Sequence, residues 1–215
     1  MQNPTHFWRV GVLALFLGGN AIADSHRLDE AAVAAAMHAA FEDKKQATLD
    51  RLDQDETQKL CTAARDGELA PAVAKKLAAD NLATVKLPAD GNFLGDWKAG
   101  ETVAITGTGL QSSDDPTKPN GGNCYACHEL AASEMAYGTL GPSLREYGKL
   151  RGQDPAVLRY TWEMIYNSNS HAPCSNMPRF GHRGILTETQ MKDVMAFLFD
   201  AASPVNQPAP PAAKP

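Results

Sequence analysis

The feature that most constrains the fold of this chain is one pentapeptide, Cys124-Tyr125-Ala126-Cys127-His128. Two cysteines separated by two residues and followed at once by a histidine form the pattern that attaches a c-type haem. The two thiols add across the haem vinyl groups, and the histidine binds the iron. Random placement of 4 Cys and 6 His in 215 residues would give only about 0.002 such motifs. The sequence therefore predicts one covalently attached haem c, held by Cys124, Cys127 and His128.

A thioredoxin-like redox motif is the other interpretation of two cysteines at this spacing. That motif follows a strand and opens a helix. Residues 114–123, in front of Cys124, instead form a polar stretch with two prolines and two glycines, which is typical of a loop. The context favours haem attachment.

Met177 is the candidate for the second axial ligand of the iron. It lies 49 residues after His128 (177 − 128), and Pro178 follows it, so it does not sit inside a helix. A thioether in a loop can be directed at iron, and a second ligand suits a protein that transfers electrons without binding small molecules. His171 and His182 are the rival ligands.

Two other methionines have a plainer interpretation. Met191 and Met195 share one apolar face of an expected helix over residues 188–200, where methionine normally fills the core. Thr187 with Gln190 forms a capping box at the start of this helix. We therefore expect both methionines to pack in the core.

The composition narrows the class of fold and of partner. Lys and Arg number 20 against 25 Asp and Glu, a net charge of −5, and no basic run occurs. This argues against nucleic acid or an anionic membrane surface as the main partner. Alanine-rich blocks at 31–40 and 70–83, with only 7% aromatic residues, favour helices over a β-sandwich or barrel. The expected fold class is all-α.

The N-terminal segment predicts export. Arg9 precedes an apolar stretch over residues 10–17, and the small residues at 21–23 have the spacing that a signal peptidase recognises. The stretch is too short for a bilayer and no other segment is apolar enough, so we expect no membrane span after removal of residues 1–23. The alternative is a buried N-terminal helix, but the polar residues 24–27 follow at once. We expect a periplasmic protein.

The rest of the chain divides into three parts. Residues 24–90 have helical periodicity but little bulky apolar content, so we expect a helical extension that packs on the next domain or on a partner chain. A boundary rich in Gly, Pro, Asp and Asn at 88–97 leads into the haem-bearing domain at 91–203. The proline-rich residues 204–215 are expected to form an extended tail that does not pack.

Local signals within the extension predict where its helices begin and end. Asp55 with Gln58 resembles a capping box, and Gly67 lies where a helix would stop. Pro71 is suited to the first turn of another helix, which is expected to run through Leu82.

Several features together resemble a class I cytochrome c. They are the haem motif, the Gly-Pro-Ser-Leu sequence at 141–144, the Asn-Met-Pro-Arg-Phe-Gly sequence at 176–181 and the C-terminal helix. More narrowly, residues 121–204, with Tyr-Asn-Ser-Asn at 166–169, resemble the SoxX family of monohaem subunits in thiosulfate-oxidising SoxAX complexes. The resemblance implies helices wrapped around one haem, with a first helix near 100–109 crossing the last at 188–200.

The resemblance also suggests roles for residues around the haem. The Pro142 carbonyl, next to Gly141, would accept the proton on the second imidazole nitrogen of His128 and so fix the ring; an ordinary turn is the alternative. Three side chains are candidates to donate hydrogen bonds to the haem propionates, although each also suits a surface or core position: Arg145, Arg179 and Trp162.

The function that the resemblance implies is electron transfer. In SoxAX complexes thiosulfate is joined to a cysteine of a carrier protein, and two electrons leave through haem to an acceptor cytochrome. The expected partners are a larger SoxA-like c-type cytochrome in a heterodimer, and transiently the sulfur carrier and the acceptor. We expect no turnover by this chain alone. A free-standing electron shuttle and a haem-based sensor or peroxidase, which needs an open axial position, are the other functions considered.

Cys61 and Cys174 remain after haem attachment. A leftover pair in an oxidising compartment most often forms a disulfide. This bond would link the extension to the segment that carries Met177, across 113 positions (174 − 61). The alternative is a sulfur-handling thiol, but the resemblance places the persulfide-bearing cysteine on the partner subunit.

Overall fold

The structure, a computed structural model, describes residues 29–64 and 69–208. Over these ranges the regular elements are helices, and the β pairing is limited to one isolated bridge between Lys44 and Ala47. The predicted all-α class is confirmed. The signal segment at 1–23 and the stop expected at Gly67 lie outside the described residues. The elements are α1 (Glu30–Ala40), η1 (Leu49–Leu52), α2 (Glu56–Ala63), α3 (Pro71–Ala83), α4 (Trp97–Ile105), η2 (Cys124–Ala126), α5 (Tyr147–Arg151), α6 (Pro155–Tyr166), η3 (Ser168–Ser170), α7 (Glu188–Phe199) and η4 (Pro204–Asn206).

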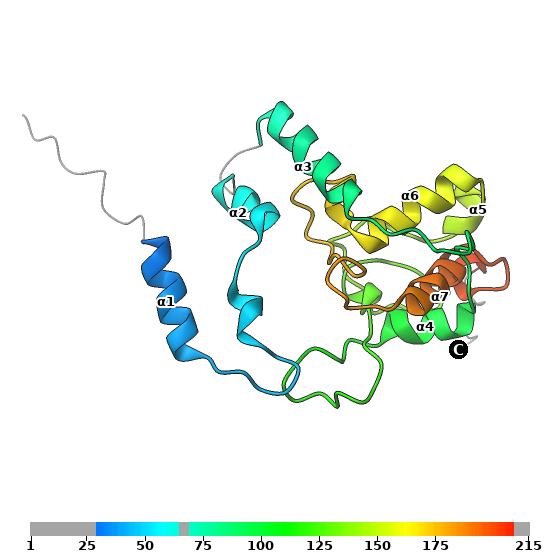
Figure 1. Ribbon diagram of the computed structural model, residues 1–215. Coiled ribbons are helices and arrows are strands. Elements are labelled where there is room, and N and C mark those ends of the chain that lie inside the picture. The colour runs from blue at the N-terminus through cyan, green and yellow to red at the C-terminus, as the bar shows by residue number, and fades with distance from the viewer. Residues whose placement is uncertain (1–28, 65–68, 209–215) are drawn as a thin grey trace, which may run out of the picture.

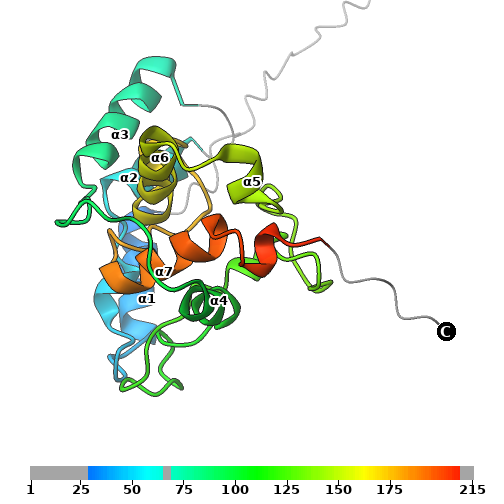
Figure 2. The same ribbon diagram turned by 90° about the vertical axis from the view of Figure 1, so that its right-hand side faces the viewer.

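Helices α4 and α7 cross at the centre of the domain that carries the haem motif (Figure 2). Gly100 of α4 lies at the crossing, where a Cβ atom would lie 2.0 Å from the carbonyl oxygen of Asp193 and 2.9 Å from the Cβ of Phe197. Only glycine allows two helix backbones to approach this closely. The expected crossing of the first and last helices of this domain is confirmed.

The bounds of α4 differ from those expected. The helix begins at Trp97, not at residue 100, because the Asp96 carboxylate accepts a hydrogen bond from the Lys98 amide at 2.9 Å and caps the first turn. It ends at Ile105, not at residue 109, because Thr106 is extended and its carbonyl accepts from the Asn123 amide at 2.9 Å. The chain leaving α4 is thereby joined to the residue in front of the haem motif.

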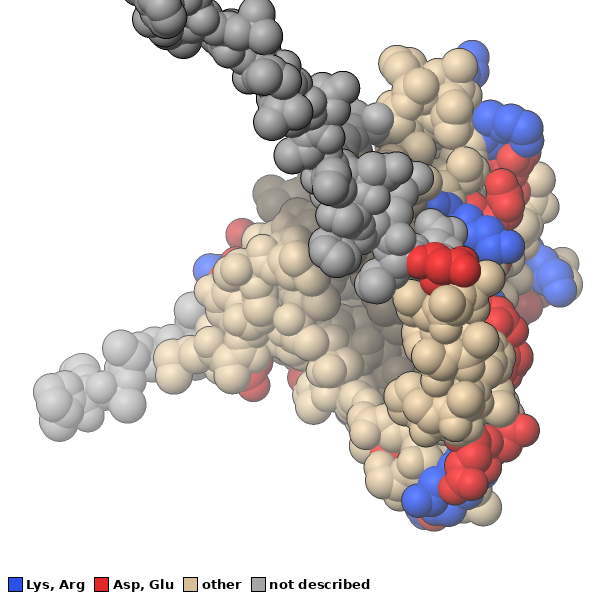
Figure 3. Space-filling model, turned by 90° about the vertical axis from the view of Figure 1, so that its left-hand side faces the viewer, with Lys and Arg blue, Asp and Glu red and all other residues tan. Residues whose placement is uncertain are grey.

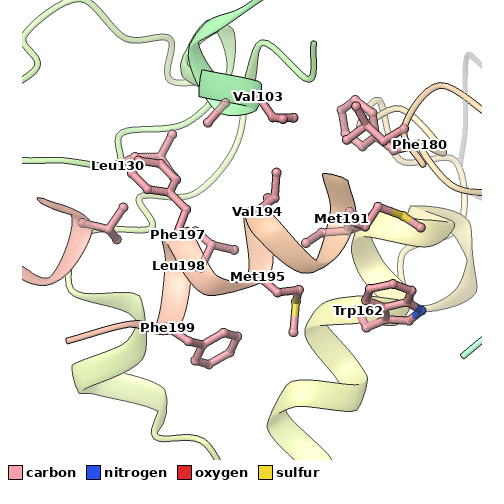
Figure 4. Packing of buried hydrophobic residues seen from close by; sticks show 14 of the residues in the cluster. Val103, Leu130, Trp162, Phe180, Met191, Val194, Met195, Phe197, Leu198 and Phe199 are labelled. Atoms are coloured by element: carbon pink, nitrogen blue, oxygen red, sulfur yellow. The ribbon is translucent and has the colours of Figure 1, made fainter. Parts of the chain in front are cut away.

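The hydrophobic core lies on both sides of α7. Figure 4 shows Val194 directed toward Val103 of α4, and Met195 on the opposite side of α7, which faces α6. Met191 and Met195 are 2% and 0% exposed, so their expected place in the core is confirmed. The capping box predicted at the start of α7 is also present. These contacts position the segments that carry the site.

The extension lies along one side of this domain (Figure 1). The capping box of Asp55 and Gln58 starts α2, as predicted, and α3 runs from Pro71 to Ala83. A buried amide pair attaches α3, since Asn167 Nδ2 donates to Asn81 Oδ1 at 2.9 Å. The extension therefore packs on its own chain.

Within the described ranges, we find no helix long and apolar enough to cross a membrane.

The tail departs from what its prolines predicted. Pro204–Asn206 forms the short 3-10 helix η4, and Val205 is only 1% exposed. Asn206 Nδ2 donates to the Leu198 carbonyl at 3.0 Å, which satisfies one of the last carbonyl groups of α7. The expectation that the chain stops packing at Pro204 is wrong for these three residues, because one apolar side chain and one capping amide outweigh the proline signal.

Candidate haem site

The haem motif folds into one compact turn. The amides of Cys127 and His128 both donate to the Cys124 carbonyl, at 3.1 and 2.9 Å. Asn123, just before the turn, has a φ of 46°, a left-handed conformation that asparagine tolerates better than most residues. The turn therefore brings both thiols and the imidazole together within five residues.

The Sγ atoms of Cys124 and Cys127 stand in the positions of the thioether sulfurs of an attached haem. Burial raises the pKa of the Cys124 thiol to about 12. A redox-active cysteine needs a lowered thiol pKa, so this environment is opposite to that of a thioredoxin-like site. An apolar, neutral thiol position fits a thioether bond.

His128 is held in one orientation. Its Nδ1 lies 2.8 Å from the carbonyl oxygen of Pro142, so Nδ1 carries the proton that this oxygen accepts, and Nε2 is left for the iron. The predicted role of the Pro142 carbonyl is confirmed. Gly141 packs flat on the ring, where a Cβ atom would lie 2.3 Å from Cε1.

The loop after the motif folds back along it. The Gly138 amide donates to the Tyr125 carbonyl and the Gly141 amide to the Cys127 carbonyl, both at 2.8 Å. A Cβ on Gly138 would lie 1.9 Å from the Ala126 carbonyl oxygen, so glycine is needed there as well. The close packing of Gly138 on the motif backbone is not predictable from the sequence, because a single glycine in a loop does not indicate which residues it contacts.

Met177 lies in a loop, as its following proline predicts. Its carbonyl accepts from Ser168 Oγ at 2.6 Å, and its amide donates to Ser175 Oγ at 3.2 Å. The side chain is half-buried and packs against the same apolar core as Cys124. Iron ligation by Met177 stays a prediction.

An open cavity of about 1110 Å³ lies between the extension and the Met177 loop. Met177 lines it from the loop, Asn169 from η3 and Cys61 from α2. Asn169 is 5% exposed, and its Oδ1 has no hydrogen-bond partner within the described chain. Within the described residues, the lining of this cavity includes none of Cys124, Cys127 and His128, so the cavity is not assigned to the haem. Figure 3 looks from the side of α1 and shows that this face of the molecule is hollowed.

The two rival ligands differ in their surroundings. His171 Nε2 lies 2.7 Å from the buried carboxylate of Glu163, and its ring lies 4.7 Å from that of Tyr160, measured between centroids. These contacts hold His171 away from a ligand role. Burial, followed by the nearby guanidinium groups of Arg179 and Arg183, lowers the pKa of His182.

The three candidate propionate donors have other partners. Trp162 Nε1 donates to the Lys86 carbonyl at 2.9 Å, which fixes it in the core. Arg145 Nη1 lies 3.4 Å from the Glu129 carboxylate on the surface, and Arg179 Nη2 lies 2.7 Å from the Asp55 carboxylate. All three side chains serve contacts within the protein.

The remaining cysteines, Cys61 and Cys174, form a disulfide with their Cα atoms 5.4 Å apart. The predicted bond is confirmed, and it joins α2 to the Met177 loop.

The described site thus contains a motif turn, an oriented imidazole and a loop methionine against one core. These residues fit a haem c.

Comparison with known proteins supports this assignment. The cytochrome c family matches residues 118–201, which include the haem motif, Met177 and α7. A protein of Aquifex aeolicus (strain VF5), described as an uncharacterized lipoprotein, is 40% identical over 159 residues, which cover 72% of this chain and 73% of that protein. The chain therefore contains a cytochrome c domain over residues 118–201.

Proposed function

We propose that this cytochrome c is the electron-transfer subunit of an exported, SoxAX-like complex. In the proposed reaction, the thiolate of a carrier protein and thiosulfate form a sulfur–sulfur bond, and two electrons are removed as the bond forms. This chain passes the electrons singly to an acceptor cytochrome, and it has no turnover alone. The larger subunit holds the sulfur chemistry.

The orientation of His128 supports an electron-transfer role. Bound haem supplies an Fe(III)/Fe(II) couple, and a thioether opposite histidine favours the reduced iron. The chain contributes a fixed imidazole, because the Pro142 carbonyl accepts the Nδ1 proton at 2.8 Å and raises the basicity of Nε2. A second ligand from Met177 would leave no open axial position for a sensor or peroxidase.

The observation that carries the proposal of a protein partner is an apolar surface beside the haem motif. We call this surface the haem-side patch: Met135, Tyr137 and Leu140, which are 91%, 39% and 70% exposed. Exposed apolar side chains grouped in this way mark protein interfaces. Electron transfer requires close approach to the haem, and this patch lies on the loop that is hydrogen-bonded to the motif.

Acidic side chains accompany the haem-side patch. Glu134 is exposed on the same loop, whereas Glu129 is paired with Arg145. With the chain at a net charge of −5, the Glu134 carboxylate favours a partner whose apolar contact surface has a basic rim.

The extension supports a lasting association over a brief one. Helix α1 packs against η1 and leaves Val33 and Met37 38% exposed, and Phe41, which caps its end, is 60% exposed. A diffusing shuttle has no need of such a helix, whereas a subunit can bury it against its partner. Export is supported by the Cys61–Cys174 disulfide, by the signal-like segment at 1–23 and by the relative described as a lipoprotein.

A free-standing shuttle is the second candidate, because the haem-side patch would serve brief docking equally well. Purification of the native protein from the exported fraction separates the two. We expect a second c-type cytochrome to copurify, and we expect a deletion strain to lose thiosulfate oxidation while general respiration continues. A monomer whose loss impairs respiration and leaves thiosulfate oxidation intact would favour the shuttle.

The haem-side patch is tested with Leu140→Glu. We expect this variant to keep its haem and to lose the copurifying cytochrome, because a buried carboxylate without a partner is costly. Leu150→Glu is the matched control, since Leu150 on α5 is 74% exposed and lies outside the patch. Equal recovery of the complex with both variants would contradict docking through the patch.

A further inference from the structure

One helix of the extension is tied to the Met177 loop on both sides of the methionine. Cys174, three residues before Met177, is bonded to Cys61 of α2. Arg179, two residues after Met177, pairs with Asp55, the N-cap of α2. We propose that α2 is a positioning element that holds Met177 in reach of the haem iron through these two ties.

The disulfide tie holds a backbone conformation that the loop does not favour alone. Cys174 has a φ of 62°, in the left-handed region that residues with a side chain rarely adopt. Such a residue persists where its surroundings over-determine it, and here the bond to Cys61 does so. Met177 lies three residues after Cys174, so the backbone direction fixed at Cys174 also sets where Met177 lies.

The ionic tie is half-buried, and two arginines share it. Arg179 is 8% exposed, and its Nη2 lies 2.7 Å from Asp55 Oδ2. Arg183 Nη2 lies 2.7 Å from the same oxygen, and it also donates to Gln58 Oε1 at 2.9 Å. One carboxylate therefore holds two guanidinium groups of the segment after Met177.

The loop between the ties has little structure of its own. The hydrogen bonds of Met177 go to two serines close in sequence, Ser168 and Ser175. The Ser175 amide donates to the Ala172 carbonyl, which is also local. Segments held only by local bonds open at low free energy. The ties to α2 add covalent and ionic contacts to the packing of Met177 against the core, and they limit this opening further.

A thioether bound to iron depends on such limits. The thioether is a neutral ligand that is held at the iron by its loop. When the loop opens, the axial position becomes available to exogenous ligands. The apparent affinity for an exogenous ligand rises in proportion to the population of the open state. The ties therefore control how much of the haem is bound by Met177. This inference rests on Met177 as the axial ligand, and it does not depend on thiosulfate as substrate.

The ionic tie is tested with Asp55→Asn in the haem-loaded chain. Asparagine caps a helix as well as aspartate does, so this change removes the charge and keeps the start of α2. Asp53→Asn is the matched control, because Asp53 pairs with His38 on the surface and does not contact the Met177 loop. We expect imidazole to bind the ferric haem about threefold more tightly in Asp55→Asn, and the control to remain unchanged.

The disulfide tie is tested with the double change Cys61→Ser and Cys174→Ser. We expect the near-infrared band of the sulfur–iron(III) bond to fall by roughly half or more, with imidazole affinity rising about tenfold. Hydrogen exchange should accelerate over residues 172–180 and stay unchanged over α6. If the double variant fails to fold, anaerobic thiol reduction of the ferrous wild-type protein replaces it, with carbon monoxide binding expected to track disulfide opening.

Two results would overturn the inference. The first is a haem-loaded variant that lacks both the disulfide and the ion pair and still behaves like the wild-type protein. Its near-infrared band intensity, its imidazole affinity and the hydrogen-exchange rate of its Met177 loop would all be unchanged. The second is survival of the band in Met177→Ala, which removes the premise that Met177 is the ligand. Neither result bears on copurification with a second cytochrome or on thiosulfate oxidation, so failure here is distinguishable from failure of the proposed function.

Discussion

The His128 side and the Met177 side of the site are held in different ways. His128 is fixed by Pro142, 14 positions away, and by backbone hydrogen bonds between the motif turn and the loop that follows it. The Met177 loop is fixed by side chains of α2, through a disulfide that spans 113 positions and a hydrogen bond from Arg183 to Asp55 that spans 128. One ligand is positioned locally, and the other depends on tertiary closure.

This difference has a consequence for stability. Local backbone contacts form at low cost in chain entropy, whereas contacts across more than a hundred residues require loop closure. The two sides should therefore respond differently to mutation. Mutations near His128 should change how tightly the imidazole is packed. Mutations near Met177 should change the fraction of molecules in which the Met177 loop is open.

The largest expected effect comes from removing the distal side altogether. In Met177→Ala we expect complete loss of the near-infrared band and a fall in reduction potential on the order of 0.1 V, because a thioether favours reduced iron. Near-infrared absorption spectroscopy measures the band, and redox titration measures the potential. Met195→Leu is the control, since Met195 is fully buried in the core and this swap conserves volume. An unchanged potential in Met177→Ala would transfer the ligand role to another residue, with His182 the first to examine.

A smaller effect is expected from crowding the proximal side. In Gly141→Ala the added Cβ would lie 2.3 Å from the His128 ring, so either the imidazole or the Gly141 backbone must shift, which disturbs the 2.8 Å contact with the Pro142 carbonyl. Overpacking of this kind costs about 1–3 kcal/mol, measurable by thermal unfolding of the haem-loaded protein. Pro142→Ala keeps the accepting carbonyl and should have little effect. Similar unfolding temperatures for the two variants would show that the close fit at Gly141 is unimportant.

Much of the site was predictable because its signals are local. The haem motif, the capping boxes of α2 and α7 and the loop position of Met177 each follow from a few neighbouring residues. The disulfide followed from counting, since two cysteines were left after the motif used the others. These inferences needed no knowledge of how distant segments meet.

The remaining features depend on which distant segments meet, and sequence patterns do not report this. Arg179 had seemed a propionate donor, yet it pairs with Asp55, a residue predicted only as a helix cap. The buried pair of Asn81 and Asn167 carried no apolar signal. Val205 lies in a proline-rich stretch and is nevertheless buried beside the end of α7. In each case a tertiary partner overrides the local preference.

The smallest expected effect is the acid response of the ionic tie. Burial acts to raise the pKa of Asp55, but the hydrogen bond from the Gln58 amide and the guanidinium groups of Arg179 and Arg183 outweigh it, and the pKa falls below its ordinary value of 3.8. A carboxylate with a lowered folded-state pKa stabilises the protein fully above the unfolded-state pKa. That stabilisation is lost as the pH falls through the folded-state pKa.

The near-infrared band, followed from pH 6 down to pH 2.5, tests this response. We expect the band to be constant above about pH 5 and to decline below the unfolded-state pKa of about 3.8. In Asp55→Asn the band should start lower and decline less steeply, because the amide does not titrate. His182 is present in both proteins, and because the Asp55 charge acts to raise its pKa, Asp55→Asn lowers the pKa of His182 further. The difference should be modest, since the Asp55 side chain is 30% exposed and solvent screens its ion pairs. Identical pH profiles would mean that the disulfide alone holds the Met177 loop.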